Sequence, residues 1–213
     1  MTDLVVITPY FNVHRRSTIF RNWRAFACHI AKLGGRLLTI ELAFGDRPFQ
    51  TYGPNTIHIR TNHVLWHKEA LLNYALKFIP SGYTKVAWMD ADILCFDERN
   101  WLKLASEALD NFEVVQMFQT WQRFLYCGSH DKQPSFMYAL QSEPGKISLN
   151  SWESPGGGWC ARRETITRCG FYDYGIVGSA DGLMACAFAG LKPYALHRIP
   201  EAFRGKYSEW AAK

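Results

Sequence analysis

The sequence lacks the features that define several common classes of protein. None of its six cysteines forms a Cys-x-x-Cys pair, which argues against a zinc site, and several of them stand inside apolar runs. No apolar stretch approaches the roughly 18 residues of a membrane-spanning helix. The first residues show no basic region, apolar region and cleavage site of a secretory signal. We therefore expect a soluble, cytoplasmic protein with no membrane span and with reduced thiols.

A phosphate-binding loop of the Gly-Lys-Ser/Thr type is also missing, although Gly156, Gly157 and Gly158 stand in a row. Such a run predicts close backbone approach or hinge motion.

There is no internal repeat and no low-complexity tract. The 213 residues, 48% of them hydrophobic, suit one globular domain. The net charge of +5 suits ligands that carry phosphate, but it is too small to establish nucleic-acid binding. The 15% aromatic content fits either a ligand with flat faces or a core rich in tryptophan.

Strand-like and helix-like patterns alternate through the first 118 residues. Predicted strands cover residues 4–8, 37–43, 56–61, 84–89 and 114–118; predicted helices cover 19–33, 67–79 and 101–109, the last capped by Asp97. This alternation predicts an α/β fold: a mainly parallel, Rossmann-like sheet flanked by helices in a single domain. Such sheets bind ligands at the carboxyl ends of their strands.

The second half of the chain is less regular. Residues 121–158 are polar and aromatic and contain three prolines, which predicts a long irregular connection that is either functional or mobile. Residues 162–169 look helical, and Ser179 starts a second helix of small residues that ends at Ala189. Residues 193–197 are predicted to form the last strand, followed by a solvated or phosphate-binding basic tail.

Two acids close the strand predicted at residues 84–89. In an extended backbone, Asp90 and Asp92 point to the same side. Two carboxylates that face one point repel each other unless a cation lies between them. A hard divalent ion that also contacts phosphate oxygens is the natural partner. The alternative is a pair of solvated turn aspartates.

These acids and several other motifs resemble, in order, those of the GT-A glycosyltransferases, especially the inverting family-two and galactosyltransferase-like branches. The resemblance covers residues 4 to about 198. It includes the loop Ile7-Thr-Pro-Tyr-Phe-Asn, Lys68 and Asn73, the Asp-x-Asp at Asp90, Gly157-Gly158-Trp159, Phe171-Tyr-Asp, Ser179-Ala-Asp181 and His197.

The resemblance implies a role for each matching position. Donor-binding positions are Thr8, Pro9, Tyr10, Asn12, Lys68, Asn73, Asp90, Ala91 and Asp92, and Gly157, Gly158 and Trp159 lie beside the sugars. Asp90, Asp92 and His197 are the expected ligands of Mn(II) or Mg(II). Residues 1–118 form the half that binds the nucleotide sugar, and residues 119–213 form the half that binds the acceptor and carries catalysis.

The expected activity is transfer of a sugar from a nucleotide sugar, with UDP as the expected nucleotide. The metal neutralises the departing diphosphate, and Asp181 acts as the general base that activates the acceptor. The alternative for Asp181 is an acid that favours a helix N-terminus. A base across the sugar from the leaving group predicts inversion. The acceptor is left open among a saccharide, a protein, a lipid-linked sugar and a nucleic-acid base.

Two departures from the family pattern keep other functions open. Ala180 stands where the family has a glutamate, and residues 119–158 have no family counterpart. A non-catalytic module that binds a sugar or a nucleotide is therefore one alternative. A nucleotidyltransferase is another, although the loop after the first strand contains basic residues and no glycine.

Overall fold

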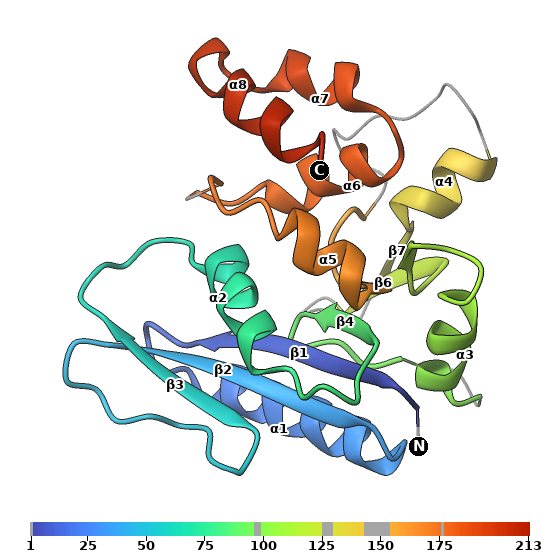
Figure 1. The fold of residues 1–213 in the computed structure, drawn as a ribbon. Helices are drawn as coiled ribbons and strands as arrows, with labels where there is room; N and C mark the ends of the chain where they lie inside the picture. Colours follow the sequence, from blue (N-terminus) through green and yellow to red (C-terminus); the bar gives the residue numbers. More distant parts are fainter. Residues whose placement is uncertain (1, 96–98, 125–129, 143–153, 176) are drawn as a thin grey trace.

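The fold is given by a computed structural model, which describes residues 2–95, 99–124, 130–142, 154–175 and 177–213 (Figure 1). A six-stranded sheet with the order β3-β2-β1-β4-β8-β5 forms its centre. The parallel strands are β1 (Leu4–Phe11), β2 (Arg36–Phe44), β3 (Thr56–Thr61) and β4 (Lys85–Met89). β8 (Gly158–Arg162) runs antiparallel to both β4 and β5 (Val114–Gln116). The predicted α/β sheet, mainly parallel, is thus confirmed.

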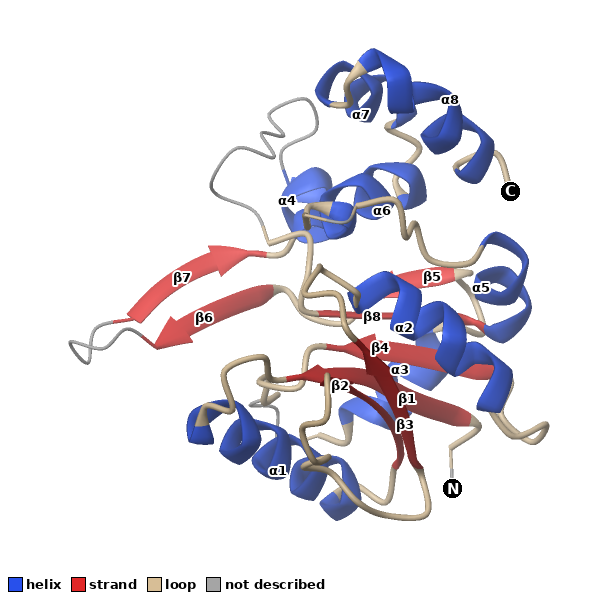
Figure 2. Cartoon of the chain, turned by 90° about the vertical axis from the view of Figure 1, so that its left-hand side faces the viewer, coloured by secondary structure: helices blue, strands red, loops and turns tan. Residues whose placement is uncertain are grey.

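Helices cover both faces of the sheet because each strand buries alternate side chains on opposite sides. Leu4 and Val6 of β1 pack against α1 (Ser17–Lys32) and α3 (Trp101–Ala108). Val5 and Ile7 belong to the larger core on the other face. The helices that contribute to that core are α2 (Lys68–Ala75) with its 3₁₀ extension η1 (Leu76–Phe78), α4 (Phe136–Ser142), α5 (Arg163–Cys169), α6 (Ala180–Phe188), α7 (Lys192–Arg198) and α8 (Glu201–Trp210) (Figure 2).

The prediction of a last strand at residues 193–197 is wrong, because this segment is the helix α7. Pro193 lies in its first turn, where a missing backbone N–H leaves no hydrogen bond unmade. The basic tail that follows is the helix α8, and its Tyr207 and Trp210 are buried in the larger core.

The stretch predicted to be irregular contains regular elements. It holds the two-stranded ribbon β6 (Thr120–Phe124) and β7 (His130–Pro134), the helix α4 (Phe136–Ser142) and the start of β8. The ribbon extends away from the main sheet (Figure 2). β8 fills the gap between β4 and β5, so the second half of the chain completes the sheet of the first half.

Several ends of elements differ from the prediction for simple reasons. β1 continues through Pro9, which has no backbone N–H to donate. The strand tolerates this residue because its pairing with β4 ends at Ile7, so no backbone donor toward β4 is needed at residue 9. Asp97, the predicted cap of α3, lies outside the described residues. The Asn100 side chain caps this helix by accepting from the amides of Leu102 at 3.1 Å and Lys103 at 3.3 Å.

The described cysteines are free thiols, and none of them is paired with another described cysteine. Within the described segments, no helix has the length and apolar character needed to cross a bilayer.

Candidate active site

Three charged side chains from distant parts of the sequence meet beyond the carboxyl end of β4. The Lys68 ammonium lies 2.7 Å from an oxygen of Asp90. It also donates to both oxygens of Asp181, at 3.1 and 3.0 Å. The strand order turns back at this edge, because β2 and β3 lie on one side of β1 and β4 on the other. Open α/β sheets bind their ligands at such a switch point.

Each side chain of this cluster is held by its own element. The Asp90 amide donates to the carbonyl of Gly157 at 3.1 Å, which fixes the first residue after β4. Lys68 opens α2, a helix that packs on β1 and β2. Asp181 lies in the first turn of α6. The helix begins directly after Ser179, whose φ of 70° turns the chain into it. β4, α2 and α6 thus converge on one point.

Burial and mutual charge set the ionisation of the cluster. Burial alone would lower the pKa of Lys68, but Asp90 and Asp181 together outweigh it and hold this pKa above its ordinary value. Burial raises the pKa of Asp181; Lys68 opposes that shift and Asp90 adds to it. Lys68 is therefore a permanent cation, and Asp181 is a carboxylate with increased affinity for a proton.

Asp92 lies beside this cluster, but not in the way the sequence predicts. The backbone leaves the extended conformation at Ala91 and Asp92, which form a turn. Asp92 is exposed, but the protein around it still removes part of its hydration. This desolvation is the main cause that raises the pKa of Asp92, and the charge of Asp90 is the second. The charge of Asp90 thus disfavours ionisation of Asp92, and a cation between the two carboxylates would relieve this repulsion.

The predicted metal-binding trio does not come together. His197 is exposed in the last turn of α7. In the part of the chain that the structure describes, no three His, Cys, Asp or Glu side chains are placed to hold a metal ion. Mg²⁺ is commonly held by one or two carboxylates with phosphate oxygens and water completing its shell. Asp90 and Asp92, with their hard oxygen donors and mutual repulsion, fit a metal held in that way.

Glu69 is a further acid that the sequence analysis missed. It lies next to Lys68 in the first turn of α2 and is only 2% exposed. Burial raises its pKa to about 7, and the charges of Asp181 and Asp90 contribute to this shift. A signal was present, because Glu69 precedes Leu72 by three residues and so continues the apolar stripe of the helix.

The glycine run lies against the acidic cluster. A β-carbon on Gly156 would come within 2.9 Å of a carboxylate oxygen of Asp181. Gly157 has a φ of 93°, and a β-carbon there would meet the Trp121 ring at 2.9 Å. At Gly158 the nearest atom would be the methyl group of Met117, at 3.2 Å. The close backbone approach predicted for this run is therefore real, and its partners include Asp181.

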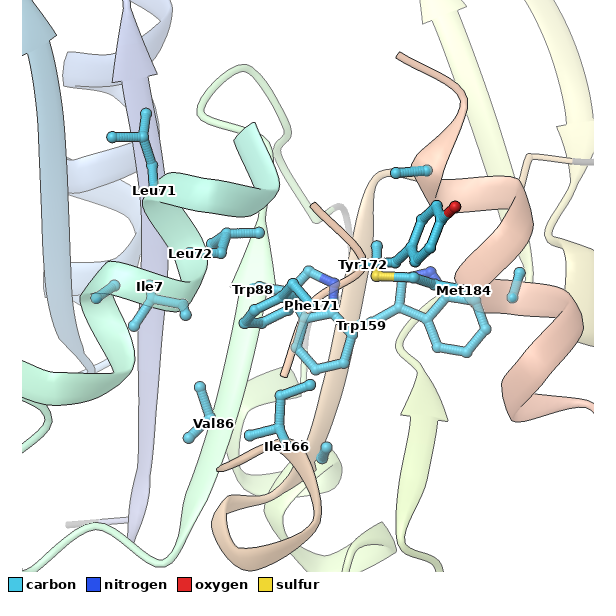
Figure 3. Close-up of a cluster of buried hydrophobic side chains, with 14 of the residues drawn as sticks. Ile7, Leu71, Leu72, Val86, Trp88, Trp159, Ile166, Phe171, Tyr172 and Met184 are labelled. Atoms are coloured by element: carbon cyan, nitrogen blue, oxygen red, sulfur yellow. The ribbon is translucent and has the colours of Figure 1, made fainter. Parts of the chain in front are cut away.

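Trp159 does not line a surface. Its side chain is 3% exposed, packs within the buried cluster drawn in Figure 3 and lies 5.4 Å from the Phe188 ring. Its indole N–H donates to the carbonyl of Pro155 at 2.7 Å. Trp159 therefore packs the core in this structure, and its side chain is not placed to stack on a sugar.

The predicted donor-binding side chains of β1 are largely engaged within the protein. The Thr8 hydroxyl is buried and donates to the carbonyl of Met89 at 2.8 Å. The Tyr10 hydroxyl donates to Gln50 at 3.0 Å, and the Asn12 side chain donates to Gln50 and to the carbonyl of Arg16, both at 3.0 Å. Pro9 is buried. These residues shape the carboxyl edge of the sheet rather than offer free polar groups.

Asn73 and Ala91 complete the set of predicted donor-binding positions. Asn73 donates to the carbonyl of Phe171 at 2.9 Å and accepts from the Phe171 amide at 2.7 Å, so it ties α2 to the loop after α5. Ala91, half-buried, separates the two acids. Of the predicted site residues, Lys68, Asp90 and Asp181 are therefore the ones whose charged side chains the structure joins, with Asp92 beside them.

A cavity of about 410 Å³ opens at the same edge of the sheet. It is lined by Val13, Phe44, Gly45, Asp46, Arg47 and Val64. Phe44 is the last residue of β2, and the other five lie in the segments that follow β1, β2 and β3. Val64 lies four residues before Lys68. The exposed Trp66 ring, two residues before Lys68 in the sequence, contacts Phe11 edge-on, with 5.4 Å between the ring centres. A cavity of this size suits a small molecule.

No family model and no curated protein matches this sequence. Among solved structures, the chain is similar to the catalytic domain of Drosophila beta1,4-galactosyltransferase 7 in complex with xylobiose, with 12% identity and a TM-score of 0.44. A variant of that Drosophila enzyme in complex with manganese, UDP-Gal and xylobiose gives 14% identity and a TM-score of 0.42. Both matches cover 90% of this chain but only 61% and 62% of the other chain, so this chain spans about three-fifths of their length. At this level of identity the likeness concerns the fold alone.

Proposed function

We propose that this chain is a metal-dependent, inverting glycosyltransferase that moves a sugar from a nucleotide sugar, with UDP as the nucleotide, to an acceptor hydroxyl or amine. One observation carries the proposal: a buried lysine joins Asp90, after the central strand β4, to Asp181, at the start of α6. This cluster lies at the switch point of a mainly parallel sheet, where ligands of such folds bind. The ordered GT-A-like motifs of the sequence contain the same three residues.

The charges of the cluster suit a diphosphate leaving group. Lys68 is a permanent cation, because its pKa lies above the ordinary value, and it can donate to phosphate oxygens as a point charge. Asp90 and Asp92 would hold a divalent ion, which when bound neutralises negative charge on the diphosphate. The nucleoside would lie in the 410 Å³ cavity lined by the last residue of β2 and by residues that follow β1, β2 and β3.

Asp181 is proposed as the general base. Its raised pKa brings its proton affinity closer to neutral pH, which favours proton transfer from an acceptor. Lys68 orients the carboxylate through its two hydrogen bonds. A base that approaches the sugar from the side opposite the diphosphate produces inversion at the anomeric carbon.

Amide and alanine variants test these roles. With a donor that the wild type consumes, Asp181→Asn and Asp92→Ala are each expected to lower turnover by roughly 10²-fold or more. Asp110→Asn is the matched control, because Asp110 is an exposed acid that pairs with Lys85 at the opposite end of β4. Turnover at the wild-type rate in both site variants would refute the proposal.

A further inference from the structure

Lys68 stands where a cation is expected. Its ammonium contacts Asp90 at 2.7 Å and both oxygens of Asp181 at 3.0 and 3.1 Å, so its donors are directed at these carboxylates. The residue is 5% exposed, and its described ion pairs are these two. Lys68 therefore neutralises one proposed metal-holding acid and the proposed base.

We propose that Lys68 masks the metal position in the donor-free protein, so that a divalent ion binds tightly only together with a diphosphate that takes over the Lys68 ammonium. The inference rests on the proposed function and deepens it, because it gives Lys68 a role in the order of binding. It makes tight metal binding conditional on the donor.

The physical reason is the repulsion between like charges. A divalent ion on Asp90 would lie close to an ammonium bound to the same carboxylate, where the repulsion is large in a partly buried site. If a metal ion displaced Lys68 from Asp90, the buried ammonium would keep Asp181 but lose one of its two ion pairs, which is unfavourable unless another anion replaces Asp90. A diphosphate supplies that anion.

The same movement would release the base. While Lys68 donates to both oxygens of Asp181, this carboxylate has fewer lone pairs with which to accept a proton from an acceptor. A shift of the ammonium toward the diphosphate frees one or both oxygens. The mask would thus keep Asp181 occupied until the donor is in place.

The chain contains a natural control at the other end of β4. Lys85 likewise joins two acids, Asp110 at 2.6 Å and Asp3 at 3.5 Å. Paired substitutions at either end of the strand leave the net charge unchanged, so a difference between them cannot come from bulk charge.

The test is a titration with Mn²⁺ alone, followed by the electron paramagnetic resonance signal of the free ion. In the absence of nucleotide, the variant Lys68→Gln/Asp181→Asn is expected to bind Mn²⁺ roughly tenfold or more tightly than the wild type. The variant Lys85→Gln/Asp110→Asn is expected to match the wild type. Adding UDP should strengthen Mn²⁺ binding in the wild type much more than in the first variant.

The outcomes separate the two proposals. The masking role of Lys68 is wrong if the wild type binds Mn²⁺ with UDP but the Lys68→Gln/Asp181→Asn variant binds Mn²⁺ no more tightly than the wild type without UDP. It is also wrong if the wild type binds Mn²⁺ tightly without UDP. In both cases the proposed function stands. If no protein binds Mn²⁺ with or without UDP, the proposed function fails together with the mask. Should the polar variant not fold, Lys68→Met/Asp181→Leu replaces the pair by apolar groups, which buried sites often tolerate, and the same gain is expected.

Discussion

At the scale of single residues, Gly156 is the position where backbone and chemistry are most closely linked. A methyl group on Gly156 would lie 2.9 Å from the Asp181 carboxylate, the flexible end of a side chain that can move aside. Gly156→Ala is therefore expected to leave the melting temperature almost unchanged while turnover falls roughly tenfold, because the added methyl group displaces the proposed base Asp181 from its position in the site. Initial rates and thermal melts of the same samples check this.

Gly82→Ala is the matched control, since no atom lies within 4 Å of the β-carbon it would add. Equal turnover in the two alanine variants would show that the position of Asp181 against Gly156 has no part in the activity.

Glu69 gives the second prediction at this scale. Its pKa is raised to about 7 from an ordinary 4.5, so the folded state binds a proton more tightly than the unfolded state. The free energy of unfolding should therefore fall as pH rises from about 4.5 to 7, by about 2–3 kcal/mol for this group, and stay level above. Glu69→Gln should remove this loss and be more stable than wild type at pH 8, but not at pH 4.5.

Urea denaturation at both pH values, without divalent ions, measures the effect. If the difference in unfolding free energy between Glu69→Gln and wild type is the same at pH 8 and pH 4.5, the raised pKa of Glu69 is wrong.

Sequence patterns identify single residues from their neighbours along the chain. They do not predict contacts between residues that are distant in the sequence. Lys68 and Asp181 were singled out, but nothing in the chain indicated that one lysine would bridge Asp90 and Asp181. Trp159 was expected beside a sugar because Gly157-Gly158-Trp159 resembles a family segment, yet its ring is buried in the core after β8 pairs with β4.

At the scale of elements, the cap of α3 is a direct test of local structure. The Asn100 side chain accepts from two amides in the first turn, which would otherwise lack partners. Asn100→Ala should lower the free energy of unfolding by about 1 kcal/mol. Asn111→Ala, at an exposed position after the helix, is the control and should change it by less than about 0.5 kcal/mol. Chemical denaturation of both variants measures these changes in the free energy of unfolding, and equal changes would contradict the role of the Asn100 cap.

The helix α8 supports a second test, because the sequence analysis treated this segment as a tail. Trp210 is buried against Tyr207 and Tyr172, and its indole N–H donates to the carbonyl of Gly170 at 3.0 Å. Trp210→Ala should cost about 3–5 kcal/mol of unfolding free energy. Phe203→Ala, in the same helix but 53% exposed, should cost far less. Similar losses in both variants would mean that α8 does not pack as described.

Elements with a strong local pattern were predictable, and elements that depend on distant partners were not. The strands β1, β2 and β4 are largely buried runs of apolar residues, and β3 alternates apolar and polar residues, so local patterns alone identify all four. β8 is a short strand that exists through pairing with β4 and β5. The segment of α7 is only seven residues long and has three apolar residues in its middle, and such a short segment fits a strand as well as a helix.

At the scale of the whole molecule, alternation of strands and helices was enough to predict a mainly parallel sheet and to expect ligands at its carboxyl edge. It could not show that β8 from the second half lies between β4 and β5. This insertion matters for the site, because the Asp90 amide donates to Gly157 at the start of β8. The two halves therefore build the proposed active site together.

The most direct test of the proposed function is mass spectrometry of a panel of nucleotide sugars incubated with the protein and acceptors, with and without Mn²⁺. The proposal predicts that a UDP-sugar is consumed, that UDP is released, and that both depend on the metal and on Asp181. Release of pyrophosphate would instead indicate nucleotidyl transfer, and binding of a donor without consumption against a broad acceptor panel would indicate a non-catalytic module. Either result would contradict the role assigned here to Asp90, Lys68 and Asp181.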